Sequence, residues 1–193
     1  IIGDSKMGAF LKSRREKRYY DIFSRMFNDL LAIKTVRDGN FANMGEVFQE
    51  IQKLSLDEER CFNGFLSHRR LSHRIAYVAL GERDMKPFCR SFDPDTVVSV
   101  ARSVADLLAE ESGCLGLVCY FDDPAVSDLV QFRVRRSMRF KGFDLRRILQ
   151  IFSIENGGGH EGAIGFRLPR RQVGDFASYV AHLIDGIEAA LEG

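Results

Sequence analysis

Short apolar runs alternate with amphipathic stretches from residue 73 to the C-terminal end of the sequence. Apolar runs bounded by glycine or Asp-Pro are typical of buried strands, and apolar residues at three- and four-residue steps are typical of helices. The predicted strands are Arg74–Leu80, Leu115–Phe121, Leu129–Arg136 and Gly162–Leu168, and the predicted helices start at Asp93 and cover Asp144–Phe152 and Val173–Leu191. This order predicts an α/β fold, in which helices cover a small mixed sheet in a layered sandwich.

The chain up to residue 72 is predicted to be helical. Apolar residues recur at helical spacing over Arg14–Ile33 and again over residues 47–54, and Ser55 with Glu58 has the spacing of a helix-capping box. These helices carry no cluster of catalytic side chains. We therefore expect an N-terminal helical segment before the α/β domain.

Composition excludes several classes of protein. Of the 193 residues, 45% are apolar and 28% are charged, which is typical of globular chains and unlike disordered ones. The 28 basic and 27 acidic residues leave a net charge of +1. This excludes a protein that coats nucleic acid with a uniformly basic surface, although it does not exclude a local basic site. No apolar run is long enough for a transmembrane helix, and the first residues lack the pattern of a signal peptide.

The four cysteines have neither the paired spacing of a zinc site nor the density of a disulfide framework. They are Cys61, Cys89, Cys114 and Cys119. Reduced thiols are the rule in the cytosol. We therefore expect free thiols, no metal in this chain and a cytoplasmic protein.

Three consecutive glycines stand in the segment Asn156-Gly157-Gly158-Gly159-His160. Such a run costs folding entropy and so needs a physical reason. Successive glycine N–H groups can form a concave nest for a phosphate, to which the histidine adds a directed donor. The alternative is a flexible surface loop, and composition alone does not decide between the two.

Basic residues concentrate shortly before the glycine run. Seven lie between positions 133 and 147, with Asp144 as the only acid: Arg133, Arg135, Arg136, Arg139, Lys141, Arg146 and Arg147. Arg133 and Arg135 are two apart in a predicted strand, so they share one face, and an arginine can engage phosphate through two parallel hydrogen bonds. We interpret the cluster as an electrostatic guide for a polyanion, with solvated surface arginines as the alternative. Phe140 and Phe143 are either stacking platforms for bases or anchors of the loop.

Other polar residues are given structural interpretations. Asp122 and Asp123 follow a predicted strand and precede Pro124, so a turn is favoured over a metal site. His68 and His73 have no acid or cysteine that would complete a ligand set. We interpret both histidines as surface or helix-cap residues.

The segment Gly157–Phe166 resembles the GGGHxxAxGF signature of the DHH-associated domain, the C-terminal domain of the DHH phosphoesterase superfamily. The resemblance covers residues 73–193. It implies that Gly157, Gly158, Gly159 and His160 cradle a substrate phosphate, with Arg133 as a donor from the neighbouring strand. Arg135 shares the strand face of Arg133 and joins this set. The candidate nucleic-acid contacts are Arg136, Arg139, Lys141 and Phe140.

The resemblance also implies a phosphoesterase, a hydrolase related to single-strand exonucleases, oligoribonucleases and exopolyphosphatases. The catalytic domain of that superfamily uses Asp-His-His and Asp-x-Asp motifs to bind two divalent metals, which we expect to be manganese. No Asp-His-His occurs in this sequence, and two-metal hydrolysis needs several such ligands in one cleft. We therefore expect no catalytic residues, no metal ligands and no cofactor in this chain. Residues 1–72 are then a helical segment or a linker to a missing catalytic domain.

Two other interpretations stay open. In one, the chain is a non-catalytic module that binds a nucleotide or single-stranded nucleic acid. In the other, it is an interaction domain whose glycine loop is structural. For the leading interpretation, the expected partner is a nucleotide or a short single-stranded nucleic acid, no membrane is involved, and a homodimer is compatible with the sequence.

Overall fold

The computed structural model describes residue 11, residues 13–33 and residues 53–192. The chain forms two compact units, which divide between Leu54 and Ser55. The helix predicted over residues 47–54 lies largely outside the described residues. Within the described part, no helix is long and apolar enough to cross a membrane.

The first unit contains helix α1 (Arg14–Ile33), which has the predicted bounds. Just before it, the Ser13 hydroxyl accepts the backbone N–H of Glu16 at 3.1 Å, and the Glu16 carboxylate accepts that of Ser13 at 2.9 Å. This reciprocal cap satisfies two N–H groups that the first turn of a helix leaves without partners. It explains why the helix begins at Arg14.

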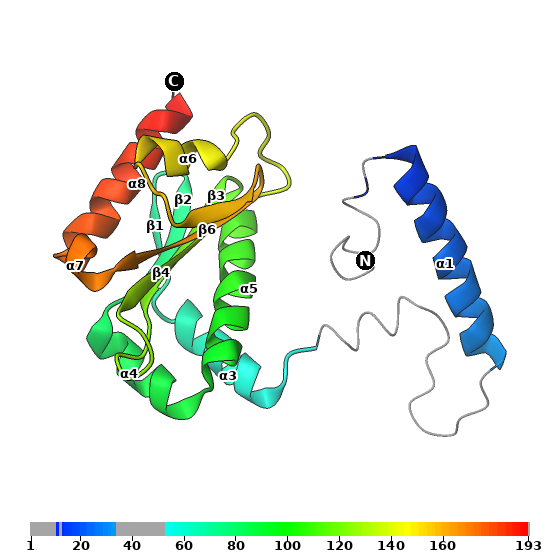
Figure 1. Cartoon of the computed structure of the whole chain (residues 1–193), viewed down its shortest axis with the longest axis horizontal. Helices are drawn as coiled ribbons and strands as arrows, with labels where there is room; N and C mark the ends of the chain where they lie inside the picture. The colour runs from blue at the N-terminus through cyan, green and yellow to red at the C-terminus, as the bar shows by residue number, and fades with distance from the viewer. Residues whose placement is uncertain (1–10, 12, 34–52, 193) are drawn as a thin grey trace. The chain divides into compact units, whose positions relative to one another are not determined.

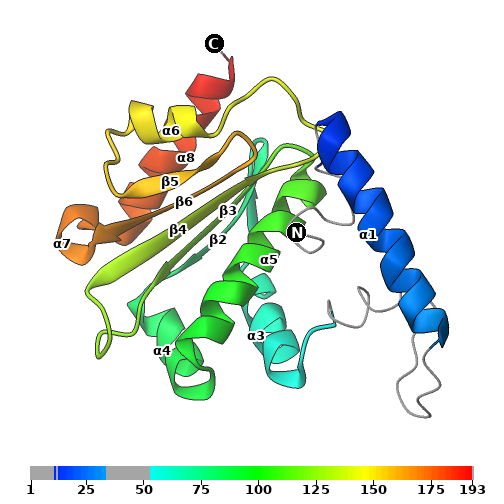
Figure 2. The same cartoon turned by 45° about the vertical axis from the view of Figure 1, so that its right-hand side comes forward.

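The second unit is built around one six-stranded sheet (Figures 1 and 2). Its strands are β1 (Arg70–Ser72), β2 (Ile75–Leu80), β3 (Leu115–Phe121), β4 (Leu129–Arg136), β5 (Gly157–His160) and β6 (Ala163–Pro169). Its helices are α3 (Leu56–Leu66), α4 (Glu82–Ser91), α5 (Pro94–Ser112), α6 (Arg146–Ile151), α7 (Arg170–Val173) and α8 (Phe176–Glu192). The strand order is β1-β2-β3-β4-β6-β5, with β2 and β3 parallel and the other neighbours antiparallel.

This arrangement confirms the predicted α/β layered fold with an N-terminal helical segment. The four predicted strands are present as β2, β3, β4 and β6, and the predicted helices as α5, α6 and α8. Four elements were not predicted. Strand β1 has only three residues and α7 only four, α4 contains Pro87, and β5 consists of three glycines and a histidine.

Helix α3 belongs to the sheet domain. Ser55 and Glu58 form the predicted capping box at its start, with hydrogen bonds of 3.2 and 2.8 Å. Cys61 and Phe65 are fully buried in the core that α3 shares with α5. The sequence predicts that the α/β domain starts at residue 73. The compact unit begins earlier, at Ser55, and includes α3.

Helices cover both faces of the sheet (Figures 1 and 2). On one face, α6 and α8 enclose a core in which Leu183 packs near the stacked rings of Phe132 and Phe166, whose centroids lie 4.6 Å apart. On the other face, α3, α4 and α5 pack against β2 and β3, around Val104 and Val118. The domain is thus a three-layer sandwich with one core on each side of the sheet.

Helix α5 sets the geometry of the second face. It begins where the Asp93 carboxylate accepts the Thr96 N–H at 2.9 Å, and it ends at Gly113, whose φ of 70° favours glycine. Its middle touches β3, since a Cβ on Gly116 would lie 2.2 Å from the carbonyl oxygen of Ala105. Glycine thus lets the two backbones meet and fixes α5 over β2, β3 and β4.

The same face is open over β6 and β5. Directly opposed residues of antiparallel strands share a face, so one row runs from Val118 under α5 through Arg133 and Gly165 to Gly158 at the sheet edge. Arg167, two residues from Gly165 on the same face, is exposed, as is Gly158. Several of the predicted site residues lie on this open part.

All four cysteines are free, and three of them, Cys61, Cys114 and Cys119, are buried. Burial raises the pKa of the Cys61 thiol to about 12, because a thiolate would lose its hydration there. Burial also raises the pKa of Cys119 well above its ordinary value. These thiols are packing residues of the core, not nucleophiles.

Replacing Gly116 by alanine is expected to lower the free energy of unfolding of the sheet domain by about 2–3 kcal/mol. The added methyl group would lie 2.2 Å from the carbonyl oxygen of Ala105 and 2.5 Å from the backbone nitrogen of Ala109, so α5 must move off the sheet. Urea unfolding followed by circular dichroism measures the change, since the chain has no tryptophan.

Gly162→Ala is the control for this measurement. Its methyl group would find its nearest neighbour at 3.6 Å, which is an ordinary contact, so the free energy of unfolding should change by less than about 1 kcal/mol. A Gly116→Ala protein as stable as this control would contradict the close approach of α5.

Candidate functional site

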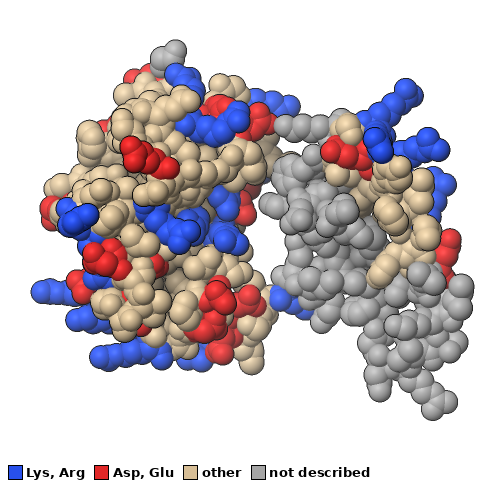
Figure 3. Space-filling model, in the orientation of Figure 1, with Lys and Arg blue, Asp and Glu red and all other residues tan. Residues whose placement is uncertain are grey.

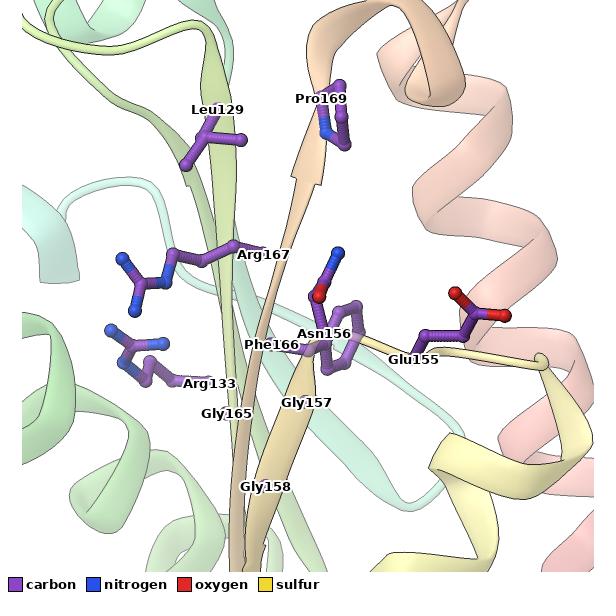
Figure 4. A pocket seen from close by; sticks show the side chains of 10 residues that line it. All are labelled: Leu129, Arg133, Glu155, Asn156, Gly157, Gly158, Gly165, Phe166, Arg167 and Pro169. Carbon is purple, nitrogen blue, oxygen red and sulfur yellow. The ribbon is translucent and has the colours of Figure 1, made fainter.

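A groove of about 530 Å³ lies beside β6 and β5 at the open part of the sheet, and the side chains that line it extend to both sides of the strands (Figure 4). Its lining consists of Leu129, Arg133, Glu155, Asn156, Gly157, Gly158, Gly165, Phe166, Arg167 and Pro169. Gly158 and Gly165 oppose each other in β5 and β6, so part of the floor is bare main chain. The volume is of the order that small-molecule sites have.

The glycine run is the edge strand β5 and not the loop that the sequence predicted. Gly157–His160 pairs with Ala163–Phe166 of β6 in antiparallel register. In such a ladder, alternate residues turn their N–H groups toward the partner strand and away from it. Three consecutive N–H groups therefore do not converge on one phosphate, and the nest hypothesis is wrong. The strand contributes a floor without side chains instead.

The surroundings that a side chain would meet differ among the three glycines of the run. A Cβ on Gly157 would lie 2.7 Å from Leu149 of α6. Gly159 has a φ of 142°, and its Cβ would lie 2.1 Å from the carbonyl oxygen of Ala163. A Cβ on Gly158 would meet nothing within 4 Å, because this position faces the groove. The fold thus requires Gly157 and Gly159, whereas Gly158 keeps the groove clear.

Arg133 lies across the floor of the groove. Its guanidinium group donates to the carbonyl oxygen of Phe132 and to the side-chain oxygen of Gln131, both at 3.1 Å. It rests on Gly165, where a Cβ would lie only 2.9 Å from Nη1. Partial burial lowers the pKa of Arg133, and three neighbouring arginines lower it further. Cationic charge is therefore crowded at this point.

Two of these arginines, Arg167 and Arg102, were not identified from the sequence. Figure 4 shows the guanidinium group of Arg167 on the same side of the sheet as that of Arg133, while Glu155 points to the opposite side. Arg102 lies on α5, and its positive charge contributes to the lowered pKa of Arg133. Figure 3 shows basic side chains gathered near the centre of this face. Within the described part of the chain, no carboxylate forms an ion pair with Arg102, Arg133 or Arg167.

Most other arginines of the stretch 133–147 pair with acids. The ion pairs are Arg135 with Asp106 at 3.3 Å, Arg136 with Glu161 at 4.0 Å, Arg139 with Glu110 at 3.9 Å and Arg146 with Asp144 at 2.6 Å. The Arg146 pair holds the pKa of Asp144 at about 2. The stretch is therefore a weaker guide for polyanions than its composition predicts, whereas Arg133 and Arg167 at the groove have no carboxylate partner within the described residues.

The structure brings only part of the predicted site together. Gly157, Gly158 and Arg133 line the groove. The residues outside its lining are Gly159, His160, Arg135, Arg136, Arg139, Lys141 and Phe140. Nδ1 of His160 accepts the N–H of Gly162 at 3.2 Å, which leaves Nε2–H free to donate to a ligand. A phosphate contact by His160 stays a prediction.

The two phenylalanines of the basic stretch anchor it. Phe143 is 4% exposed, and Phe140 is half-buried against the same core. The guanidinium carbon of Arg147 lies 5.3 Å from the centre of the Phe143 ring. These positions favour the anchoring interpretation over base stacking.

Asp122 and Asp123 form the predicted turn after β3. The Asp123 carboxylate accepts the Ala125 N–H at 2.9 Å, and the Asp122 N–H donates to the Leu129 carbonyl oxygen at 3.0 Å. Among the described residues, His, Cys, Asp and Glu side chains do not gather in threes as a metal site requires.

No protein-family model matches the sequence, and no curated protein matches it. Among solved structures, an exopolyphosphatase-related protein from Bacteroides fragilis aligns with a TM-score of 0.62 and 15% identity. The alignment covers 97% of this chain and 47% of that one, so this chain spans about half the length of its neighbour. The two proteins share a fold.

Two further solved structures align less closely. The C-Ala domain of alanyl-tRNA synthetase from Aquifex aeolicus gives a TM-score of 0.41 at 13% identity, over 61% of this chain and 96% of that domain. The pGpG-specific phosphodiesterase PggH from Vibrio cholerae gives 0.40 at 10% identity, over 84% of this chain and 56% of that one.

Alanine at Gly159 is expected to destabilise the protein by roughly 1–3 kcal/mol, and alanine at Gly158 by less than about 0.5 kcal/mol. The first change forces a side chain into a strained φ and against the backbone of β6, whereas the second places a methyl group in the open groove. Urea unfolding of the two variants measures the difference. Equal losses of stability would show that β5 does not have the described register.

Proposed function

We propose that this chain is the substrate-binding part of a phosphoesterase, and that its groove holds the phosphate of a nucleotide or of a short single-stranded oligonucleotide. The observation that carries the proposal is the pair formed by Arg133 and Arg167. Their side chains extend to the same side of the sheet (Figure 4), and within the described residues no carboxylate pairs with either.

Electrostatics favours an anion between these groups. Like charges in a partly buried site repel each other more strongly than they do in water, and a bound anion relieves that repulsion. A guanidinium group can offer two parallel N–H donors, which matches the spacing of two phosphate oxygens. The bare main chain at Gly158, where a Cβ would meet nothing within 4 Å, lets a ligand approach the sheet closely.

The remaining lining supports a ligand larger than inorganic phosphate. Asn156 and Glu155 line the groove on the β5 side, away from the guanidinium groups (Figure 4). An asparagine amide both donates and accepts hydrogen bonds, as the edge of a nucleobase does. Leu129 and Pro169 add apolar surface at one end. A phosphate at the arginines and a base near Asn156 would use both sides.

Two likenesses support the assignment to a phosphoesterase. The segment Gly157–Phe166 resembles the signature of the DHH-associated domain. The fold is shared with an exopolyphosphatase-related protein, whose chain is about twice as long as the part aligned. In this proposal, the hydrolytic step and the manganese ions belong to a catalytic domain outside the present sequence.

Glutamine at Arg133 or at Arg167 is expected to raise the dissociation constant for AMP roughly tenfold or more, because each change removes a charge-assisted hydrogen bond to phosphate. Isothermal titration calorimetry on the whole chain measures the affinity. Binding should weaken as salt concentration rises, and adenosine, which lacks the phosphate, should bind far more weakly than AMP.

Arg139→Gln is the matched control for these variants. Arg139 belongs to the same basic stretch, but it lies outside the groove and 3.9 Å from Glu110. Its replacement should leave AMP affinity within about twofold of the wild type. The proposal fails if AMP and adenosine bind alike, or if loss of Arg139 matters as much as loss of Arg133 and Arg167.

A further inference from the structure

The buried side chain of Gln131 links Asp122 to Arg133 beside the groove. Its Nε2 donates to the Asp122 carboxylate at 2.8 Å, and its Oε1 accepts from Nη2 of Arg133 at 3.1 Å. Gln131 is only 5% exposed, so water competes little for either hydrogen bond. The three side chains form one line of hydrogen bonds that ends at the groove.

The two partners determine the orientation of the Gln131 amide. A carboxylate only accepts hydrogen bonds and a guanidinium group only donates them. The NH₂ group must therefore face Asp122, and the carbonyl oxygen must face Arg133. Arg133 is thus held by an uncharged acceptor, and the nearest charge of this line, on Asp122, stays on the far side of the amide.

We propose that Gln131, supported by Asp122, is a positioning residue that holds Arg133 ready for an anionic ligand without neutralising its charge. The inference rests on the function proposed for the groove and concerns how its central arginine is kept available. It also specifies the ligand class, because an arginine that keeps its full charge selects anions over neutral molecules of the same shape.

Arg135 shows what happens without such an arrangement. It lies two residues from Arg133 on the same face of β4, but it pairs with the Asp106 carboxylate at 3.3 Å and does not line the groove. A carboxylate at position 131 would engage Arg133 in the same way. It would then compete with phosphate for the same N–H groups.

Gly165 restrains Arg133 from the other side. The guanidinium group lies so close to this glycine that a Cβ there would come within 2.9 Å of Nη1. Arg133 is therefore restrained by Gln131 on its own strand and by the bare surface of β6. A long side chain that is already ordered loses less conformational freedom when it binds, which favours affinity.

The decisive test moves the carboxylate from position 122 to position 131. In the double variant Asp122→Asn, Gln131→Glu, the new amide can donate to the new carboxylate, which can accept from Arg133. Both hydrogen bonds and the net charge are kept, and only the place of the negative charge changes. We expect the dissociation constant for AMP, measured by calorimetry on the 193-residue chain, to rise roughly tenfold or more while Tm changes by only a few degrees.

Asp122→Asn alone is the matched control. Its side-chain oxygen can still accept from Gln131 and no carboxylate is placed beside Arg133, so AMP affinity should fall much less than in the double variant. The inference is overturned if the double variant binds AMP like the wild type while Arg133→Gln does not, or if Asp122→Asn alone loses as much affinity as the double variant. If the wild type binds no AMP, the proposed function fails and this inference fails with it.

Gln131→Met provides a second measurement should the double variant fold poorly. It keeps the size of the side chain and removes both hydrogen bonds. In ¹⁵N-labelled protein without ligand, we expect the Nε–H resonance of Arg133 to broaden or to move toward that of a solvent-exposed arginine. AMP affinity should fall roughly fivefold. An unchanged resonance together with unchanged affinity would overturn the inference.

Discussion

The backbone contact between α5 and β3 at Gly116 determines how the second face of the sheet is divided. A helix that lies this close to one strand covers that strand and its neighbours, here β2 and β4, and leaves the farther strands uncovered. The open half cannot be filled with large apolar side chains without exposing them to water. It carries arginines and glycines instead, and this combination leaves both charge and space at the surface.

Ion pairing, and not the number of basic residues, determines which arginines around the groove stay available to a ligand. Acids on α5 and in the loops neutralise the arginines around the groove, such as Arg135 and Arg139. Arg133 and Arg167 are left without such partners in the described part of the chain. A chain with a net charge of only +1 can therefore present a strongly cationic site, because opposite charges placed close together cancel each other's field elsewhere.

The fold could be predicted from the sequence wherever burial imposed a period. The runs that became β2 and β3, the cap at Asp93 and the stripe of α8 are signals of this kind. Strand β5 could not be predicted, because glycines carry no hydrophobic pattern and their pairing with β6 depends on contacts beyond the local sequence.

The candidate site could be predicted only in part for the same reason. Strand alternation put Arg133 on the correct face, and the same rule applied to β6 would have identified Arg167, two residues after Gly165. Arg102 carries no comparable signal, since an arginine on the polar face of a helix is commonplace. The pairing of Arg135 with Asp106 joins distant parts of the sequence, so composition overestimated the charge available to a ligand.

A groove floor made of main chain has an evolutionary consequence. Mutation changes side chains, and the floor at Gly158 has none, while any side chain added at Gly157 or Gly159 would collide with Leu149 or the backbone of β6. Gly165 is similarly constrained, because Arg133 lies against it. Selection for a different ligand could therefore act on this groove through its walls, at positions such as Asn156 and Arg167, and through Gly158, where the fold leaves room for a side chain.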